Sequence, residues 1–343
     1  MNALVVPKYG APDVVEVRSL PEPSPRRGEI VVRVAATTVN SGDARLRSAD
    51  FPPGMALLGR LMFGWTGPRS PVLGAELAGV VERVGPGVTT FAVGDRVLAM
   101  TGFRMGAHAE RCVIAADHCT VRLPDTVPFD VAVTLPFGGT TALTYLRDKA
   151  RLQSSERILV IGASGAVGAA CVQVARLLGA RVTGVCSGRN ADLVRTLGAE
   201  RVIDYTTTDP FATDEHWDVV IDTVGRATAR QCRALATPTG RIGLVASGLP
   251  TLLLAPWVNL TSRQRVLVGP ADESPAHVAQ LVEWLEQGSW KPVIDGRFGM
   301  ADAAEAYARV DSQRKVGSVV LTLEGGASVL RDDVVTGAQD AGS

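Results

Sequence analysis

The sequence predicts an α/β protein in which a mainly β region precedes a parallel sheet made of alternating strands and helices. Short runs rich in Val and Ile, bounded by Gly, Pro or Asp, predict strands in the first third at 28–34, 78–84, 94–100 and 111–115. From about residue 138, apolar five-residue runs alternate with helix-like stretches. This alternation predicts βαβ units, whose successive strands run parallel.

The later elements follow from the same periodicity. Apolar runs predict parallel strands at 157–161, 181–185 and 218–222, and the helical spacing of apolar residues predicts a helix at 167–178. Two amphipathic stretches and a final apolar run predict helices at 276–288 and 301–311 and a strand at 317–323. The small, polar tail from about residue 325 is expected to be poorly ordered and flexible.

Length and charge narrow the functional classes. The chain has 343 residues, which at about 150 residues per domain predicts two domains. Its 35 basic and 35 acidic side chains give a net charge of 0, so no nucleic-acid partner is expected. Five cysteines without a CxxC pair indicate free thiols in a reducing compartment. Without an export signal or a long apolar run, we expect a cytoplasmic protein with no membrane partner.

Residues 51–71 form a long connection that is rich in Gly and Pro and yet carries Met, Leu, Phe and Trp. One interpretation is a short helix packed on the core. The other is a lid or wall for an apolar substrate, and both can hold together.

A glycine-rich turn at 162–168 carries the clearest chemical signal. It follows a predicted strand and precedes a predicted helix, and residues 163–168 match G-x-G-x-x-G with Ala163 in the first glycine place. Gly165 would let the backbone approach a pyrophosphate, which would face the free N–H groups at the helix start, and Gly168 would allow close helix–strand packing. The pattern predicts a dinucleotide site.

The end of the second parallel strand indicates which dinucleotide is bound. An NAD site places Asp or Glu about 20 residues after the glycines, whereas this chain has Ser187, Gly188 and Arg189 there. A guanidinium offers a planar fork of donors that matches a 2′-phosphate. The sequence therefore predicts NADP(H); the alternative is that Arg189 is an ordinary solvated side chain.

Several phrases carry a family resemblance: NSGD at 40–43, LGAELAGVVERVGPGVTTFAVGDRV at 73–97, GAHAE at 106–110, LPFGGTTA at 135–142, the 162–168 turn, LGAERVIDY at 197–205 and DTVG at 222–225. Up to about residue 323, the chain resembles the medium-chain dehydrogenases/reductases, specifically their zinc-independent quinone-oxidoreductase-like branch.

The resemblance implies an architecture and an assembly. A GroES-like β-rich catalytic domain would comprise residues 1–125 and 270–343, and a Rossmann domain with a doubly wound parallel sheet would comprise 126–269. The active site would lie in the cleft between them. The strand near 265–269 would pair with its copy in a second subunit, which implies a homodimer.

The resemblance also implies site residues. Asn40 would lie beside the nicotinamide and position it or a water molecule. Cofactor contacts would come from Thr141, Ser164, Gly165, Ala166, Val167, Ser187, Arg189, Tyr205, Val224 and Ser247. His108 takes the place of an aromatic residue near the nicotinamide, where an imidazole could donate a proton or line the pocket; packing in the core is the alternative.

Departures from the zinc-dependent relatives predict that no metal is bound. Ser41 and Ala75 stand where zinc enzymes of the superfamily carry a Cys and a His, and the four-cysteine zinc loop is missing. The pairs His108–Cys112 and His118–Cys119 match no common zinc spacing. Tyr145 and Lys149 resemble the pair of short-chain dehydrogenases only by coincidence, because they precede the glycine turn.

Together these observations predict an NADPH-dependent oxidoreductase that delivers a hydride to a small apolar acceptor, either a quinone or an enal or enone. The segment 51–71 and a loop at 248–260 would enclose that substrate, and water or His108 would supply the proton. One alternative is a zinc-free NADP-dependent alcohol/aldehyde oxidoreductase. An alternative from another class is an NADPH-binding regulatory protein without catalytic activity.

Overall fold

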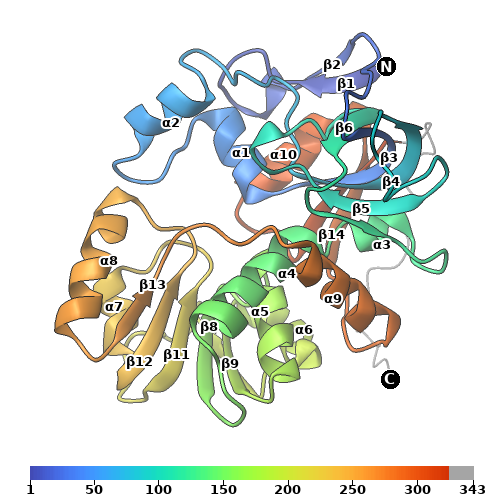
Figure 1. Cartoon of the computed structure of the whole chain (residues 1–343). Helices are drawn as coiled ribbons and strands as arrows, with labels where there is room; N and C mark the ends of the chain where they lie inside the picture. Colours follow the sequence, from blue (N-terminus) through green and yellow to red (C-terminus); the bar gives the residue numbers. More distant parts are fainter. Residues whose placement is uncertain (324–343) are drawn as a thin grey trace, which may run out of the picture.

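The computed structural model describes residues 1–323, and one of its two lobes, at the top of Figure 1, is built on a seven-stranded sheet. The sheet follows the order β14-β15-β3-β4-β5-β7, and β6 also pairs with β3. Its strands are β3 (Glu29–Val39), β4 (Glu76–Val84), β5 (Arg96–Met100), β6 (Arg111–Ala115), β7 (Thr120–Arg122), β14 (Ile294–Gly299) and β15 (Ser318–Thr322). The four strands predicted in the first third are β3 to β6.

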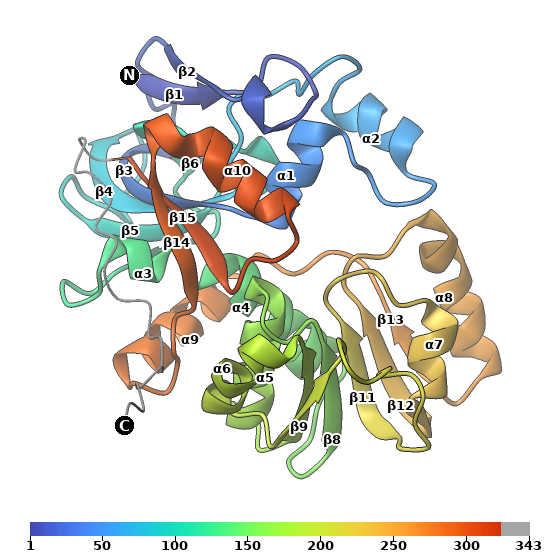
Figure 2. The same ribbon diagram turned by 180° about the vertical axis from the view of Figure 1, so that it is seen from behind.

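The end of the described chain completes this first sheet. Strand β15 pairs antiparallel with β3, with Val319 opposite Val39, and β14 lies parallel to β15 on its other side. Helices α1 (Ser41–Ser48) and α10 (Ala303–Asp311) lie against each other beside the sheet (Figure 2). A separate hairpin of β1 (Asn2–Val5) and β2 (Glu16–Ser19) lies at the edge of this lobe.

The other lobe contains a six-stranded sheet in which, over the described residues, every pairing is parallel. Its order is β10-β9-β8-β11-β12-β13, formed by β8 (Arg157–Ile161), β9 (Arg181–Cys186), β10 (Arg201–Asp204), β11 (Trp217–Asp222), β12 (Ala236–Leu244) and β13 (Arg265–Leu267). The order reverses between β8 and β11, which is the switch point of a doubly wound Rossmann sheet. The predicted α/β fold is confirmed.

Helices cover both faces of the parallel sheet (Figures 1 and 2). Next to β8 and β9 lies α5 (Ala166–Leu177), followed by α6 (Ala191–Leu197), whereas α7 (Ala229–Ala234) and α8 (Leu249–Thr261) lie beside β11 to β13. The lobes are joined through α3 (Phe129–Ala132), α4 (Pro136–Ala142), the π-helical turn Leu143–Lys149 and α9 (Pro275–Glu286).

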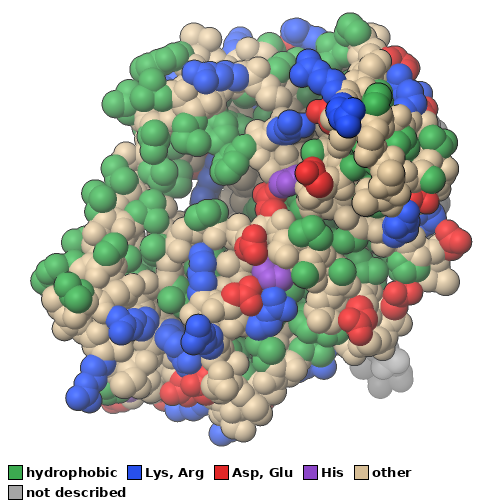
Figure 3. Space-filling view, in the orientation of Figure 1, with side chains coloured by type: hydrophobic (Ala, Val, Ile, Leu, Met, Phe, Trp, Pro, Cys, Tyr) green, Lys and Arg blue, Asp and Glu red, His purple; other side chains and the backbone are tan. Residues whose placement is uncertain are grey.

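Two segments differ from the sequence-based expectation. The predicted loop at 248–260 is mostly the helix α8, because Pro250 lies in its first turn, where proline is tolerated, and leucines follow. Residues 51–71 contain α2 (Ala56–Phe63), whose apolar side chains are largely exposed, so this helix is not packed into the core. Figure 3 shows apolar side chains gathered on the edge formed by α2 and α8.

The domain boundaries predicted after residues 125 and 269 stay a prediction. They are compatible with the two sheets, because every strand of the parallel sheet lies between them. The tail from about residue 325, expected to be poorly ordered, lies outside the described residues. Within residues 1–323, no helix is both long and apolar enough to cross a membrane.

Candidate functional site

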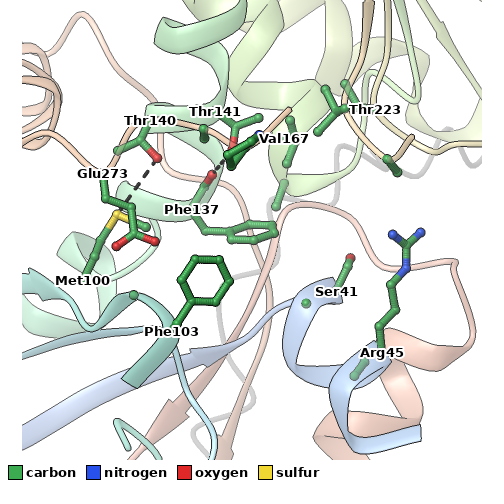
Figure 4. Close-up of a pocket in the computed structure, with 18 of the residues that line it drawn as sticks. Ser41, Arg45, Met100, Phe103, Phe137, Thr140, Thr141, Val167, Thr223 and Glu273 are labelled. Atoms are coloured by element: carbon green, nitrogen blue, oxygen red, sulfur yellow. Dashed lines mark hydrogen bonds between the residues drawn. The ribbon is translucent and has the colours of Figure 1, made fainter. Parts of the chain in front are cut away.

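A pocket of about 1310 Å³ opens between the two lobes and is the candidate site. Segments distant in sequence line it: the start of α1, the end of β5, the β6–β7 hairpin, α4, the glycine turn, the end of β11 and the chain after β13. Figure 4 shows Thr141, Val167 and Thr223 on one side of this space and Ser41 and Arg45 on another. A single cavity therefore connects the predicted dinucleotide turn to the first lobe.

The glycine turn has the tight geometry that a dinucleotide fingerprint requires. Gly162 adopts a positive φ of 83°, and Gly165 is the N-cap of α5 with its backbone extended. A Cβ built on Gly168 would lie 1.9 Å from the carbonyl oxygen of Gly162, so only glycine lets α5 approach β8 this closely. The start of α5, which is twelve residues long, points its unpaired N–H groups toward the cavity, where they fit an anionic pyrophosphate.

The structure brings five of the predicted cofactor residues into this pocket: Thr141, Gly165, Ala166, Val167 and Val224. Ser164 lies in the same turn, and its hydroxyl accepts a hydrogen bond from the side-chain amide of Asn190 at 3.0 Å. Ser247 directly follows Ala246, which lines the pocket.

The turn after β11 is fixed by a buried carboxylate that sequence reasoning did not single out. Asp222 is 1% exposed and accepts the backbone N–H groups of Val224, Gly225 and Ala227 at 2.9, 3.1 and 3.1 Å. Burial raises the pKa of Asp222, and these three hydrogen bonds oppose the rise. This carboxylate holds Val224 at the pocket wall.

Residues predicted to select the 2′-phosphate lie at the carboxyl ends of β9 and β10, next to the turn but outside the pocket. Ser187, Arg189 and Tyr205 surround this corner, and the side chains of Arg189 and Tyr205 are exposed. A Cβ built on Gly188 would lie 2.3 Å from Oδ2 of Asp204. Sequence reasoning missed this carboxylate because Asp204 belongs to the neighbouring strand β10, which runs beside β9.

Asn40 lies at the junction of β3 and α1. Its Oδ1 accepts the N–H groups of Gly42 and Asp43, while its buried Nδ2 has no hydrogen-bond partner among the described residues. An unsatisfied buried donor one residue before Ser41, which lines the pocket, fits a ligand such as a carboxamide. Together with the glycine cradle, this donor means that the residues present fit a nicotinamide dinucleotide.

His108 lies in the core rather than on the pocket wall. Its side chain is fully buried, its Nε2 is 2.9 Å from the carbonyl oxygen of Thr38, and the hydroxyl of Tyr307 is 3.2 Å from its Nδ1. A carbonyl can only accept, so Nε2 carries the proton and Nδ1 accepts from Tyr307. This arrangement corresponds to the packing alternative, and a proton-donor role for His108 stays a prediction.

The residues at the zinc-ligand positions do not fit a catalytic zinc. Ser41 and Ala75 offer no nitrogen, thiolate or carboxylate, and Glu76 is already held by the Thr38 hydroxyl and the Phe137 N–H. Residues 1–323 contain no group of three or more His, Cys, Asp or Glu side chains placed to hold a metal ion.

The first-lobe end of the pocket carries apolar side chains beside charged ones, and sequence reasoning missed these residues. Met100, Phe103 and Phe137 face a common space, and the Glu273 carboxylate points toward it (Figure 4). These residues come from β5, the turn after it, α4 and the segment that follows β13, so no local motif groups them. None of residues 51–71 lines this pocket, although the ring of Phe63 lies 6.3 Å from that of Phe103.

Lys315 reaches the pocket from the segment before β15. Its ammonium donates to the carbonyl oxygen of Gly317 at 2.8 Å, and burial lowers its pKa to about 8. The N–H of Gly317 in turn donates to the carbonyl oxygen of Ser164 at 2.9 Å, which ties the first lobe to the glycine turn.

Tyr145 and Lys149 have a structural role, as expected of a pair that precedes the glycine turn. The Tyr145 hydroxyl donates to the carbonyl oxygen of Gly269 at 2.6 Å. The Lys149 ammonium donates to the carbonyl oxygens of Val268 and Pro270, both at 3.0 Å. They pin the segment that leaves β13 and crosses toward the first lobe.

Comparison with known proteins agrees with this geometry. Residues 26–125 match the family model of the alcohol dehydrogenase GroES-like domain, and residues 197–321 match that of zinc-binding dehydrogenases. The chain is 33% identical to a quinone oxidoreductase of Pseudomonas aeruginosa over 330 residues, which cover 91% of this chain and 97% of the relative.

Solved structures give the same result for the fold. A quinone oxidoreductase from Coxiella burnetii superposes with a TM-score of 0.84 at 23% identity, covering 94% of this chain and 99% of that one. The mycobacterial protein Rv1454c, in a complex with NADPH, superposes with a TM-score of 0.77 at 27% identity and covers 94% and 100% of the two chains.

Proposed function

Because the chain belongs to the quinone-oxidoreductase-like branch of the medium-chain dehydrogenase/reductase superfamily, we propose that it is an NADPH-dependent reductase of quinones or of enals and enones. One observation carries the proposal: a single cavity joins the glycine turn to an apolar space between Met100, Phe103 and Phe137. Such a cavity suits a hydride transfer from a dinucleotide to an apolar, planar acceptor.

Each part of the site has its own task. Bound NADPH supplies the hydride. The start of α5 and Gly165 would hold the pyrophosphate, and the unpaired Nδ2 of Asn40 would bind the nicotinamide end. The rings of Phe103 and Phe137 offer apolar surface against which a planar acceptor would be oriented.

A substrate panel tests the proposed activity. We expect the purified protein to oxidise NADPH, measured by the loss of absorbance at the reduced nicotinamide band, with quinones or with enals and enones. Saturated aldehydes, which lack the conjugated C=C bond of an enal, should react more slowly, because they offer the apolar wall little contact area. Faster oxidation with aldehydes would favour the alcohol/aldehyde oxidoreductase instead. Tight NADPH binding without oxidation by any acceptor would favour the non-enzymatic alternative, and stoichiometric zinc would contradict the mechanism.

The choice of NADPH over NADH is tested by Arg189→Glu. Reversing this charge should weaken NADPH binding at least tenfold and change NADH binding much less, because a carboxylate repels the 2′-phosphate. Fluorescence titration of both reduced cofactors measures the two affinities. Arg195→Glu, the same charge change on α6 where Arg195 pairs with Asp192, is the control and should keep the NADPH affinity. Unchanged NADPH binding by Arg189→Glu would refute the assignment.

We also propose that the protein is a cytoplasmic homodimer. Support for the dimer comes from β13, which is an edge strand of the parallel sheet, and from the exposed side chains of Leu253, Trp257 and Leu260 on the adjacent helix α8. Support for a reducing compartment comes from the cysteines of the described chain, all of which are free and buried.

A further inference from the structure

We propose that Glu273 and His118 form a proton relay that completes the reduction, with Glu273 as the proton donor and His118 as its link to solvent. The inference rests on the proposed reductase function. It addresses the step that the site described above leaves open, because hydride addition alone leaves an anionic product that needs a proton.

The two side chains meet at the first-lobe end of the pocket, and both line it. Nε2 of His118 lies 3.3 Å from Oε2 of Glu273. The Oε2 atom is shielded from solvent and has no well-aligned hydrogen-bond partner among residues 1–323. Figure 4 shows the Glu273 carboxylate directed into the space bounded by Met100, Phe103 and Phe137, where the acceptor is proposed to bind.

The backbone holds both partners firmly. Glu273 directly precedes Ser274, the N-cap residue of α9, and the Asp272 N–H donates to the Thr144 hydroxyl at 2.9 Å. The hydrogen bonds of Tyr145 and Lys149 fix the preceding residues of the same segment. His118 lies in the hairpin between β6 and β7, where its N–H donates to the carbonyl oxygen of Ala115. Gly102 passes close to both groups, since a Cβ there would lie 3.1 Å from Oε2 and 3.3 Å from Nε2.

The surroundings of Glu273 suit a proton donor, and those of His118 suit a group that exchanges protons with solvent. Burial raises the pKa of Glu273, the charge of His118 lowers it, and the neighbouring Asp272 raises it. A carboxyl group with a raised pKa stays protonated up to a higher pH, and a general acid must carry a proton to donate it. The imidazole of His118 is 42% exposed, so it can exchange protons with water. Asp272 and Asp117 also face this corner, whereas burial raises the pKa of the Cys119 thiol to about 12 and keeps it neutral.

The step balances. The acceptor receives a hydride from NADPH, which leaves as NADP⁺, and the acceptor becomes an enolate or a hydroquinone monoanion. The O–H bond of Glu273 breaks as its proton passes to that anion, forming a C–H or an O–H bond. The carboxylate regains a proton from the His118 imidazolium, and the imidazole takes one from water.

Glu273→Gln is the central test, made with the whole protein and with an enone and a quinone as acceptors. We expect kcat with the enone to fall about 100-fold, the usual scale for losing a general acid, while the Kd for NADPH stays within about twofold. Quinone reduction should fall less, because water readily protonates a hydroquinone anion. His118→Asn should lower kcat with the enone about tenfold. Without the imidazole, water must return the proton to the Glu273 carboxylate directly, which is slower.

Three readouts separate the relay from a structural role. In the wild type, kcat should decrease as the pH rises, because the donor loses its proton, and Glu273→Gln should abolish that decrease. Glu273→Asp should recover part of the rate, because it keeps a carboxyl group. Glu283→Gln, the same change at an exposed carboxylate on α9 away from the pocket, is the control and should stay within about twofold of the wild type. A folded Glu273→Gln protein with wild-type kcat and pH profile would overturn the relay, as would a Glu273→Asp protein no faster than Glu273→Gln.

Activity of the wild type distinguishes failure of the proposed reductase function from failure of the relay alone. If the wild type itself oxidises NADPH with neither acceptor, the reductase assignment fails and the relay fails with it. If the wild type is active and the Glu273 variants are equally active, only the relay fails.

Discussion

Replacing Gly168 with alanine is expected to destabilise the protein by about 3 kcal/mol, the upper end for overpacking a tight site. The added methyl group would lie 1.9 Å from the carbonyl oxygen of Gly162 and 2.7 Å from its carbonyl carbon. Both atoms belong to the backbone and cannot rotate away, so α5 must move off β8. Alanine gains about 1 kcal/mol of helix propensity over glycine, which is too little to offset the clash. Thermal unfolding without cofactor measures the loss.

Gly165→Ala is the matched control for this experiment. A Cβ at Gly165 would lie 3.6 Å from the same carbonyl oxygen, which is an ordinary contact, and the backbone there is extended. We expect this variant to melt like the wild type but to bind NADPH at least tenfold more weakly, because the methyl group blocks the approach of the pyrophosphate. If Gly168→Ala melted at the wild-type temperature, the close packing assigned to this glycine would be wrong.

Glu76→Gln is expected to remove most of a stability penalty that the wild type accumulates as the pH rises from 4.5 to 8. Glu76 is 2% exposed, and burial raises its pKa to about 8, although hydrogen bonds from the Thr38 hydroxyl and the Phe137 N–H oppose the rise. Between pH 4.5 and 8 the unfolded chain ionises this group and the folded chain keeps it protonated. The unfolded state therefore binds fewer protons, and the free energy of unfolding falls as the pH rises.

The difference in pKa between the folded and unfolded chain sets the size of the change in the free energy of unfolding. Each pH unit in that window costs about 1.4 kcal/mol, so the full span from pH 4.5 to 8 amounts to an effect on the order of 5 kcal/mol. Urea unfolding at pH 5, 6, 7 and 8 should show a shallower decline for Glu76→Gln than for the wild type. The measurements stop at pH 8 because Lys315, whose pKa is lowered to about 8, titrates above that pH. There the unfolded chain binds more protons than the folded chain, so the free energy of unfolding rises with pH. Glu200→Gln, at the surface, should keep the wild-type slope. Equal slopes for Glu76→Gln and the wild type would contradict the prediction.

The fold was largely predictable because its signals are local. Runs of Val and Ile mark β3 to β6, and the strand–turn–helix at 157–178 identifies the dinucleotide turn from consecutive residues. The segment 248–260, expected to be a loop, is mostly the helix α8, and Pro256 lies inside that helix. Pro250, however, falls in the first helical turn, where its missing N–H costs nothing.

The first-lobe end of the pocket was much less predictable, because its residues meet only in three dimensions. Ser41, Met100 and Glu273 are separated by most of the chain and come together through the crossing from β13 back to the first lobe. The two histidines illustrate the same limit. His108 turns inward to Tyr307, and His118 lies at the pocket, yet neither lies in a regular strand, so no periodicity indicates which way either side chain points.

The pairing of β15 with β3 has a consequence for the order in which the protein folds on the ribosome. The half of β3 that includes Thr37 and Val39 has β15 as its partner, and β15 is synthesised almost 280 residues later. The parallel sheet is made from one continuous stretch of chain, so it can form while the first sheet still lacks an edge. Newly made chains should therefore pass through a stage with a finished nucleotide-binding half and an open β3 edge, which a chaperone could protect.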